Sequence, residues 1–309
     1  MAPPAIHTTA HSDSEPTELI LPDLLSDCHY PLRPEITKFV GLCTGYLTAA
    51  CYPDADAFHL RVCSENFRHH QLLDEFDVDN ALGMRECCIS AFQDPINFQT
   101  DKTAGKMCKS LFSRFRETGG PGCTERFIHT MDLFFIAGAK EVDNRAKKHI
   151  HDLESYITFR RDTSGCKFCF VLIEYAAQID LPDEVMSHPI MMAVEDAAND
   201  HISWSNSNLA MTHSLIAVLM RERGLDLQGA VDYSGQMCKI AMQHFEDNRA
   251  TLPSWGTEVD RQVAIYVQGL QDWIVANLHW SFESTRYFGK DGQAVKQDGI
   301  VRLLPKRPL

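Results

Sequence analysis

Apolar residues recur at intervals of three and four positions along much of the chain, the spacing that places them on one face of an α-helix. The pattern is clearest over six segments: residues 36–50, 123–161, 182–204, 213–223, 227–252 and 258–288. Proline or glycine stands between several of them, where helices commonly end. The sequence lacks alternating strand patterns flanked by hairpin turns, and it has no repeat of fixed period. We therefore predict an all-α fold, a bundle of roughly ten helices.

Residues 1–20 are rich in Pro, Ser, Thr and His, a composition typical of a disordered tail. No long linker interrupts the rest of the chain. With 309 residues, 44% of them hydrophobic, the chain has enough apolar side chains for a substantial core. We therefore predict a disordered tail at 1–20 and a single domain at 21–309.

The formal net charge of −13 argues against extended binding along nucleic acid, which requires a basic face. The longest apolar runs, such as residues 133–139, are too short to span a bilayer as a helix. We expect neither a nucleic acid nor a membrane partner, and no feature of the sequence indicates an obligatory protein partner. A small anionic substrate bridged by divalent cations remains compatible with this charge.

The chain has eleven cysteines, and its first residues lack a basic start followed by an apolar stretch. We therefore expect reduced thiols and a cytoplasmic location. Cys166 and Cys169 form a lone C-x-x-C without a second pair, so buried packing is favoured over zinc binding or redox chemistry.

The segment "QLLDEFDVDN", residues 71–80, carries four carboxylates within six positions. If the segment is helical, Asp74 and Asp77 share one face, and Glu75 and Asp79 share the neighbouring face. Carboxylate oxygens are ligands that suit Mg²⁺, with water and substrate phosphates completing the octahedron. The alternative is a solvated acidic surface.

Two basic segments favour the metal interpretation. In "YITFRRDTSGCKF", residues 156–168, two arginines end a helix shortly before Gly165, and in "HWSFESTRYF", residues 279–288, Arg286 precedes Tyr287. An arginine fork suits phosphate oxygens, and a tyrosine hydroxyl adds one donor. The alternative for each arginine is a favourable interaction with the helix dipole.

Together, the acidic segment, the R-R-x-T-x-G pattern at 160–165 and the late R-Y pair resemble class I terpene synthases, specifically the fungal sesquiterpene synthases of mushrooms. The likeness extends from "LILPDLLSD" to "RYFGKDG" and includes "DLESYITFRRDTSG", "YAAQIDLPDEV", "HPIMMAVEDAANDHISWSN" and "RGLDLQGAVDYSGQM".

The resemblance implies the class I terpenoid synthase helical bundle, which binds farnesyl diphosphate with three Mg²⁺ ions and cyclises it to a sesquiterpene with release of diphosphate. It assigns diphosphate sensing to Arg161, four residues before the catalytic Gly165, and diphosphate binding to Arg161, Arg286 and Tyr287. It assigns metal binding to Asp74, Glu75, Asp77 and Asn206.

The chain departs from both metal motifs of the family. The first motif reads D-[DE]-x-x-D, whereas position 78 is Val and the acidic residue that takes the place of the last aspartate is Asp77, as though one residue were missing after Phe76. The second reads N-D-x-x-S-x-x-x-E, but counting from Asn206 its serine and glutamate positions hold Ala210 and Ser214. About two helical turns are therefore missing after Asn206, and we expect at least one metal ion to bind weakly.

A second match by letter, "NDHIS" from Asn199 to Ser203, also lacks the glutamate. Asn206 follows Arg161 by 45 residues, close to the separation in the family, so we assign the motif asparagine to Asn206 and interpret "NDHIS" as coincidence. Two readings stay open: a Mg²⁺-dependent sesquiterpene synthase, or a related protein with impaired or absent catalysis. A chain-elongating prenyltransferase is less favoured, because such enzymes carry two aspartate-rich motifs.

Overall fold

Helices account for nearly all of the regular structure in the computed structural model, which describes residues 18–28, 30, 44–74, 81–147, 151–206 and 214–303. The longer helices are α2 (Thr44–Cys51), α3 (Ala57–Asp74), α4 (Ala81–Gln93), α5 (Thr103–Thr118), α6 (Pro121–Ala146), α7 (Leu153–Thr163), α8 (Cys166–Ala177), α10 (Pro189–Ser205), α11 (Leu215–Arg223), α12 (Leu227–Ala250) and α13 (Thr257–Glu283). The shorter elements are β1 (Glu18–Ile20), α1 (Leu24–Asp27), α9 (Asp183–Met186), α14 (Thr285–Phe288), η2 (Gly289–Asp291), α15 (Gly292–Asp298) and β2 (Ile300–Arg302). The predicted all-α class is confirmed.

The predicted segment 123–161 is divided between α6 and α7. Helix α7 starts at a conventional cap, because the Asp152 side chain accepts a hydrogen bond from the Ser155 backbone N–H at 2.8 Å. The Leu153 N–H donates to the Glu222 carboxylate near the end of α11, which satisfies another unpaired donor at this helix terminus.

Four of the longer helices, α3, α4, α5 and α8, lie outside the segments in which the periodicity is clearest. Helix α5 nevertheless has a regular apolar face, and its buried side chains are Ala104, Gly105, Cys108, Leu111, Phe112 and Phe115. The rings of Phe112 and Phe115 lie 5.2 Å apart and stack nearly in parallel. This face packs into the larger of two hydrophobic cores.

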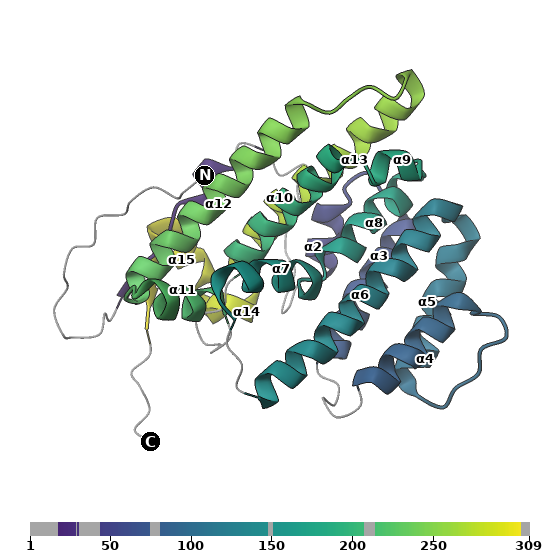
Figure 1. The fold of residues 1–309 in the computed structure, drawn as a ribbon, viewed down its shortest axis with the longest axis horizontal. Helices are drawn as coiled ribbons and strands as arrows, with labels where there is room; N and C mark the ends of the chain where they lie inside the picture. The colour runs from purple at the N-terminus through teal and green to yellow at the C-terminus, as the bar shows by residue number, and fades with distance from the viewer. Residues whose placement is uncertain are drawn as a thin grey trace.

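The helices form two groups, with α7 between them (Figure 1). Helix α10 contacts both α12 and α13, while α4 contacts α5 and α6. Helix α7 contacts both α6 and α10 and therefore connects the two groups. A second, smaller core lies around α7, α10, α11 and α12.

Small buried side chains allow α10 and α12 to pack closely. On α12, Ala230, Ser234, Cys238 and Ala241 are buried at helical spacing. The Ser234 hydroxyl donates to the carbonyl oxygen of Trp204 on α10 at 3.3 Å, an approach that a bulkier residue would prevent. The pair supports the C-terminal half of α10, which the predicted site residue Asn206 directly follows.

A short antiparallel ribbon, which the sequence analysis did not predict, joins the two ends of the described chain. Strand β1 pairs with β2 in a register that places Leu19 opposite Val301. The Gln228 side chain accepts from the Ile20 N–H at 2.9 Å and donates to the Ile20 carbonyl at 2.8 Å. It therefore pairs with both backbone groups of Ile20, as a neighbouring strand would. The ribbon includes residues 18–20 of the range predicted as a tail; residues 1–17 lie outside the described residues.

Among the described helices, none combines the length and the apolar character needed to cross a membrane. The buried cysteines of this part of the chain are free thiols, and Cys166 and Cys169 pack in the larger core.

Candidate functional site

The break between α7 and α8 occurs at Gly165, as the R-R-x-T-x-G pattern predicted. Gly165 has φ = 78° and ψ = −3°, a left-handed conformation that glycine adopts without steric cost. The chain can therefore turn within two residues from the end of α7 into α8. The turn leaves Arg160 and Arg161 in the last turn of α7.

Arg161 is bound to two carboxylates of α10. Its Nε and Nη2 donate to the two carboxylate oxygens of Asp200, each at 2.7 Å, and its Nη1 donates to Asp196 Oδ2 at 2.7 Å. Asp196 and Asp200 are four residues apart, so they lie on one face of α10. This bidentate, charge-assisted arrangement is among the stronger polar contacts in proteins.

The backbone of Arg161 is also tied to α10. The Asn199 side-chain amide donates to the Arg161 carbonyl at 2.9 Å, and the Ser203 hydroxyl donates to Asn199 Oδ1 at 3.1 Å. Asn199 and Ser203 are almost fully buried, with 1% and 2% of their surfaces exposed. The polar groups of "NDHIS" thus serve contacts between α7 and α10.

Burial raises the pKa of Asp200, and the adjacent Arg161 guanidinium opposes this shift. The hydrogen bond to Asp200 in turn raises the pKa of Arg161. The contact with Arg161 therefore favours the ionised state of both groups, while for Asp200 the opposing effect of burial is larger.

Arg160 has different surroundings from Arg161. The one hydrogen bond described for its side chain runs from Nη1 to the Thr163 carbonyl at 3.5 Å. Burial raises the pKa of Tyr287, and the positive charges of Arg286 and Arg160 act in the opposite direction. The Arg286 guanidinium lies 5.9 Å from the centre of the Tyr287 ring. Arg286 and Tyr287 therefore lie together near the end of α7.

Asn206, the predicted ligand from the second metal motif, follows the end of α10 and faces α13. Its Nδ2 donates to Asn277 Oδ1 at 2.9 Å, and its Oδ1 accepts a long hydrogen bond of 3.5 Å from the Ser281 hydroxyl. Asn277 also donates to the Ser205 hydroxyl at 3.1 Å. The asparagine is thus part of a polar contact between α10 and α13. Residues 207–213 lie outside the described residues.

The first metal motif also lies largely outside the described residues. Asp74 is the last residue of α3, but its side chain, like Glu75 and Asp77, is not among the described parts of the structure. Within the described ranges, no group of three or more His, Cys, Asp and Glu side chains is arranged to hold a metal ion. The described part of the predicted metal site, a single amide oxygen, does not fit Mg²⁺ by itself.

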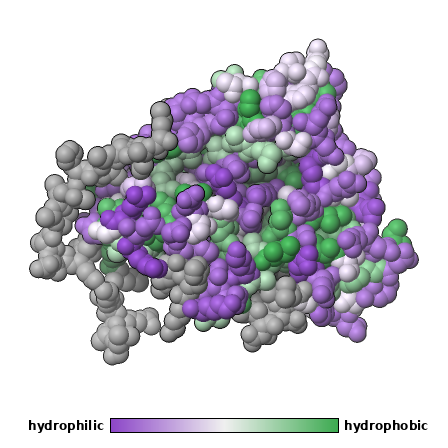
Figure 2. Space-filling model, viewed as in Figure 1, coloured by the Kyte–Doolittle hydropathy of each residue, from purple (hydrophilic) through white to green (hydrophobic). Residues whose placement is uncertain are grey.

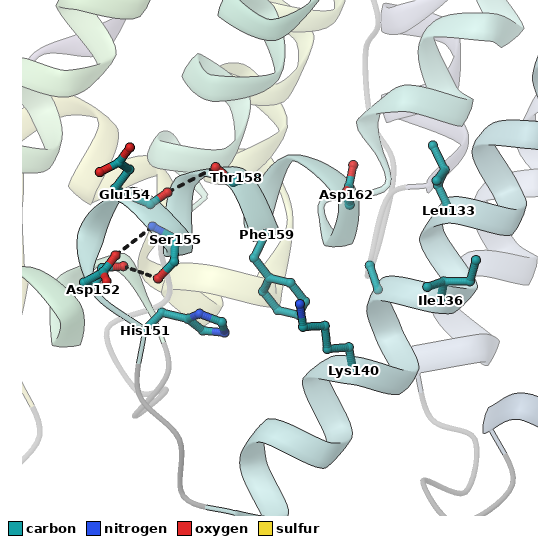
Figure 3. A pocket seen from close by; sticks show the side chains of 11 residues that line it. Leu133, Ile136, Lys140, His151, Asp152, Glu154, Ser155, Thr158, Phe159 and Asp162 are labelled. Carbon is teal, nitrogen blue, oxygen red and sulfur yellow. Dashed lines mark hydrogen bonds between the residues drawn. The ribbon is translucent and has the colours of Figure 1, made fainter.

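A surface cleft of about 580 Å³ lies between α6 and α7 (Figure 3). Its apolar part is formed by Leu133, Ile136, Ala137 and Phe159, and polar residues including Lys140 and Asp162 surround them. Apolar residues also gather towards the middle of this face in the space-filling view (Figure 2). The five predicted site residues that the structure describes, Arg161, Gly165, Asn206, Arg286 and Tyr287, do not line this cleft.

Two glutamates with partners inside the helix bundle, Glu195 and Glu174, were not predicted from the sequence. The Tyr266 hydroxyl of α13 donates to the Glu195 carboxylate of α10, and burial raises the pKa of Glu195 to about 7. Nearby, Arg126 holds the fully buried Glu174 with two hydrogen bonds of 3.1 and 2.8 Å. Glutamates in helical segments are mostly solvated, so the sequence carries no signal that distinguishes these two.

Solved structures share this arrangement of helices. The chain superposes on α-eudesmol synthase with a TM-score of 0.72, at 23% sequence identity and covering 79% of this chain and 86% of that structure. It superposes on germacradien-4-ol synthase from Streptomyces citricolor with a TM-score of 0.69, at 20% identity and covering 76% and 82% of the two chains. The fold is that of the class I terpene synthases, which confirms the predicted class.

Sequence comparison shows the family. Residues 74–244 match the sequence model of terpene synthase family 2, C-terminal metal binding. Sesquiterpene synthase Agr1 of Cyclocybe aegerita is 42% identical and is aligned over 94% of this chain and 95% of its own length. Sesquiterpene synthase 1 of Postia placenta is 42% identical over 97% and 99%. Alpha-muurolene synthase of Coprinopsis cinerea is 39% identical over 96% and 80%. The chain belongs to terpene synthase family 2.

The lengths of these alignments show that the chain differs in length from its relatives. The alignments with Agr1 and with the Postia placenta protein extend over 328 and 336 positions, more than the 309 residues of the chain. Each relative therefore has residues that have no counterpart here.

Proposed function

We propose that the protein is a sesquiterpene synthase that uses farnesyl diphosphate as substrate and requires Mg²⁺. The observation that carries the proposal is the identity of about 40% with curated sesquiterpene synthases over nearly the whole chain. The membership of a metal-binding terpene synthase family supports a divalent cation as cofactor. The retained α7–α8 break at Gly165 and the Arg286–Tyr287 pair support the same reading.

The proposed reaction begins with heterolysis of the C–O bond between the farnesyl chain and its diphosphate. The electron pair leaves with the diphosphate oxygen, and an allylic cation remains. An internal double bond attacks this cation to close a ring, and loss of a proton or addition of water ends the sequence. The products are a sesquiterpene hydrocarbon or alcohol and diphosphate.

The residues of the chain stabilise the leaving diphosphate and hold it in place. Arg286 and Tyr287 offer a guanidinium and a phenol to its oxygens, and an arginine at the end of α7 adds positive charge, a role that the family resemblance assigns to Arg161. Asp74, Glu75 and Asp77 are the proposed metal ligands, with Asn206 as a weaker one. Bound Mg²⁺ supplies positive charge that lowers the cost of the departing diphosphate.

Diphosphate release tests the proposal. The purified protein is incubated with farnesyl, geranyl or geranylgeranyl diphosphate, with Mg²⁺ or with a chelator. We expect release with the farnesyl ester and Mg²⁺ and none with the chelator. Equal, metal-independent release from all three esters would contradict a sesquiterpene synthase.

The second candidate function is a terpene-synthase-like protein with impaired or absent catalysis. The observations that favour it are the alignment gaps and the engagement of Asn206 with Asn277 on α13. Sequencing of the transcript tests this alternative. Additional codons after Asn206 would restore the motif and argue for full activity, whereas a transcript that agrees with the present sequence would favour impaired catalysis.

A further inference from the structure

The N-terminal part of the described chain runs beside α12 (Figure 1). We call residues 18–28 and 30 the N-terminal strap. Four pairs of residues join it to the helix: Ile20 with Gln228, Pro22 with Gly235, Asp27 with Lys239 and Tyr30 with Glu246. The last three helix positions follow the first by 7, 11 and 18 residues, close to whole numbers of helical turns. The strap therefore lies along a single stripe of α12.

The closest approach of the strap to α12 is at Gly235. A Cβ at this position would lie 2.5 Å from the Cβ of Pro22 and closer still to its Cγ. The proline ring is bonded to its own backbone, so it cannot turn aside as the end of a long side chain can. Glycine in the middle of a helix is less stable than alanine. Its presence at position 235 is explained by the strap, which lies directly against the helix there.

The strap is joined to the C-terminal part of the chain by the β1–β2 ribbon. Leu19 is buried in the smaller core, and Val301, which lies opposite it in the ribbon, packs against that core. The Leu21 N–H donates to the Gly299 carbonyl at 2.8 Å, which extends the pairing to the end of α15. The position of β2 is therefore set by the strap.

Arg286 and Tyr287 lie between this ribbon and the end of α13. They belong to α14, none of whose residues is fully buried. The Tyr287 ring meets Trp280 edge-on, with 5.8 Å between the ring centres, and Phe288 stacks on Phe282 at 5.3 Å. The segment is thus held by α13 on one side and, through α15, by β2 on the other.

We propose that the N-terminal strap positions the segment that carries Arg286 and Tyr287, and that the fit of Pro22 on Gly235 determines how firmly it does so. Gly235 is a positioning residue, because it acts through the strap and the ribbon rather than by contact with the substrate. The use of Arg286 and Tyr287 to bind diphosphate rests on the proposed function. The link from α12 to α14 does not depend on it.

Gly235→Ala is the test variant, and hydrogen exchange of the backbone amides is the first measurement. We expect the amides of β1, β2 and α14 to exchange about tenfold faster than in the unaltered protein, because the added methyl group forces the strap off α12. The amides of α5 should stay within about twofold. If the α14 amides exchange as they do in the unaltered protein, the strap does not position this segment and the inference is wrong.

Gly138→Ala is the matched control. Gly138 also lies inside a long helix, α6, and no atom is within 4 Å of the place where its Cβ would lie. Both substitutions favour the helix locally, so a difference between the two variants comes from the contact with the strap. We expect Gly138→Ala to leave exchange in α14 unchanged. Faster exchange there in this variant would overturn the inference.

A double-mutant cycle tests the contact itself. Pro22→Gly removes the atoms that the new methyl group would meet, so Gly235→Ala should have no further effect in that background. If Gly235→Ala accelerates exchange in α14 equally with Pro22 and with glycine at position 22, the overlap with Pro22 is not the cause and the inference is wrong.

Calorimetric titration with inorganic diphosphate and Mg²⁺ connects the strap to the site. We expect Gly235→Ala to weaken diphosphate binding about threefold to tenfold and to raise the KM for farnesyl diphosphate by a similar factor, because small displacements of binding groups have large effects. Faster exchange in α14 with unchanged diphosphate affinity would contradict a positioning role. If exchange changes as expected but the unaltered protein neither binds diphosphate nor makes a sesquiterpene, the proposed function is wrong and the link from α12 to α14 holds.

Discussion

Replacement of Gly165 by alanine tests whether the break between α7 and α8 is functional. Gly165 has φ = 78°, and an alanine in this left-handed region costs about 1–2 kcal/mol. For a protein of this size, we expect the melting temperature to fall by about 2–4 °C. Because Gly165 is buried, we expect the added methyl group also to disturb the end of α7.

Gly224 provides a matched control for the Gly165 substitution. It caps α11 with φ = 65°, is exposed, and has no atom within 4 Å of the place where a Cβ would lie. Gly224→Ala therefore carries a similar backbone cost without disturbing α7. Both variants should be less stable than the unaltered protein, and Gly165→Ala should be the less stable of the two.

The assay is turnover of farnesyl diphosphate at a temperature well below both melting points. We expect Gly165→Ala to lower kcat/KM about tenfold or more, because small displacements of binding groups have large effects on rate. Gly224→Ala should stay within about twofold of the unaltered protein, since surface substitutions have small effects. Equal losses in both variants, or full activity of Gly165→Ala, would refute a functional role for the break.

Two polar contacts between helices, Tyr266 with Glu195 and Arg126 with Glu174, give further predictions. Burial raises the pKa of Glu195 to about 7, above its ordinary value, so the folded state holds a proton that the unfolded state releases, and stability should fall as pH rises from 5 to 7. Urea titrations measure the free energy of unfolding of Glu195→Gln and of the unaltered protein. From pH 5 to pH 8, the value for the variant should rise by on the order of 2 kcal/mol relative to that of the unaltered protein. If the difference between the two proteins is the same at both pH values, the assignment is contradicted. Arg126→Met should lower the free energy of unfolding by about 3–5 kcal/mol, because Glu174 remains buried and unpaired. The double variant Arg126→Met, Glu174→Leu should recover much of this loss. If the double variant is as unstable as the single variant Arg126→Met, the reasoning is contradicted.

Much of the fold could be predicted from local sequence pattern. Periodicity is strong in α10, α12 and α13, and Gly165 and the arginines before it form a recognisable break after α7. The family resemblance extended this to the whole bundle, and both the family and the class I fold are confirmed. The β1–β2 ribbon escaped prediction because each strand has three residues, too few for an alternating pattern to be seen.

The candidate site was harder to predict than the fold, because its contacts join distant segments. Two of the three acidic residues in "VEDAAND" of α10, Asp196 and Asp200, have helical spacing, but nothing in the sequence indicates that they bind Arg161. The same is true of Asn206 and Asn277, which are 71 residues apart. Local motifs thus identified the residue types, while the partners depend on how the helices pack. The predicted roles of Arg161, Arg286, Tyr287 and the metal ligands stay proposals.

The most direct test of the proposed function is gas chromatography with mass spectrometry of the products from farnesyl diphosphate, with and without Mg²⁺. The protein is compared with a version that carries the missing residues after Asn206, taken from a sesquiterpene synthase of the family. We predict that the protein itself forms a sesquiterpene only when Mg²⁺ is present. No product from this chain at any Mg²⁺ concentration, beside an active restored version, would show that it keeps the terpene synthase fold without the catalysis.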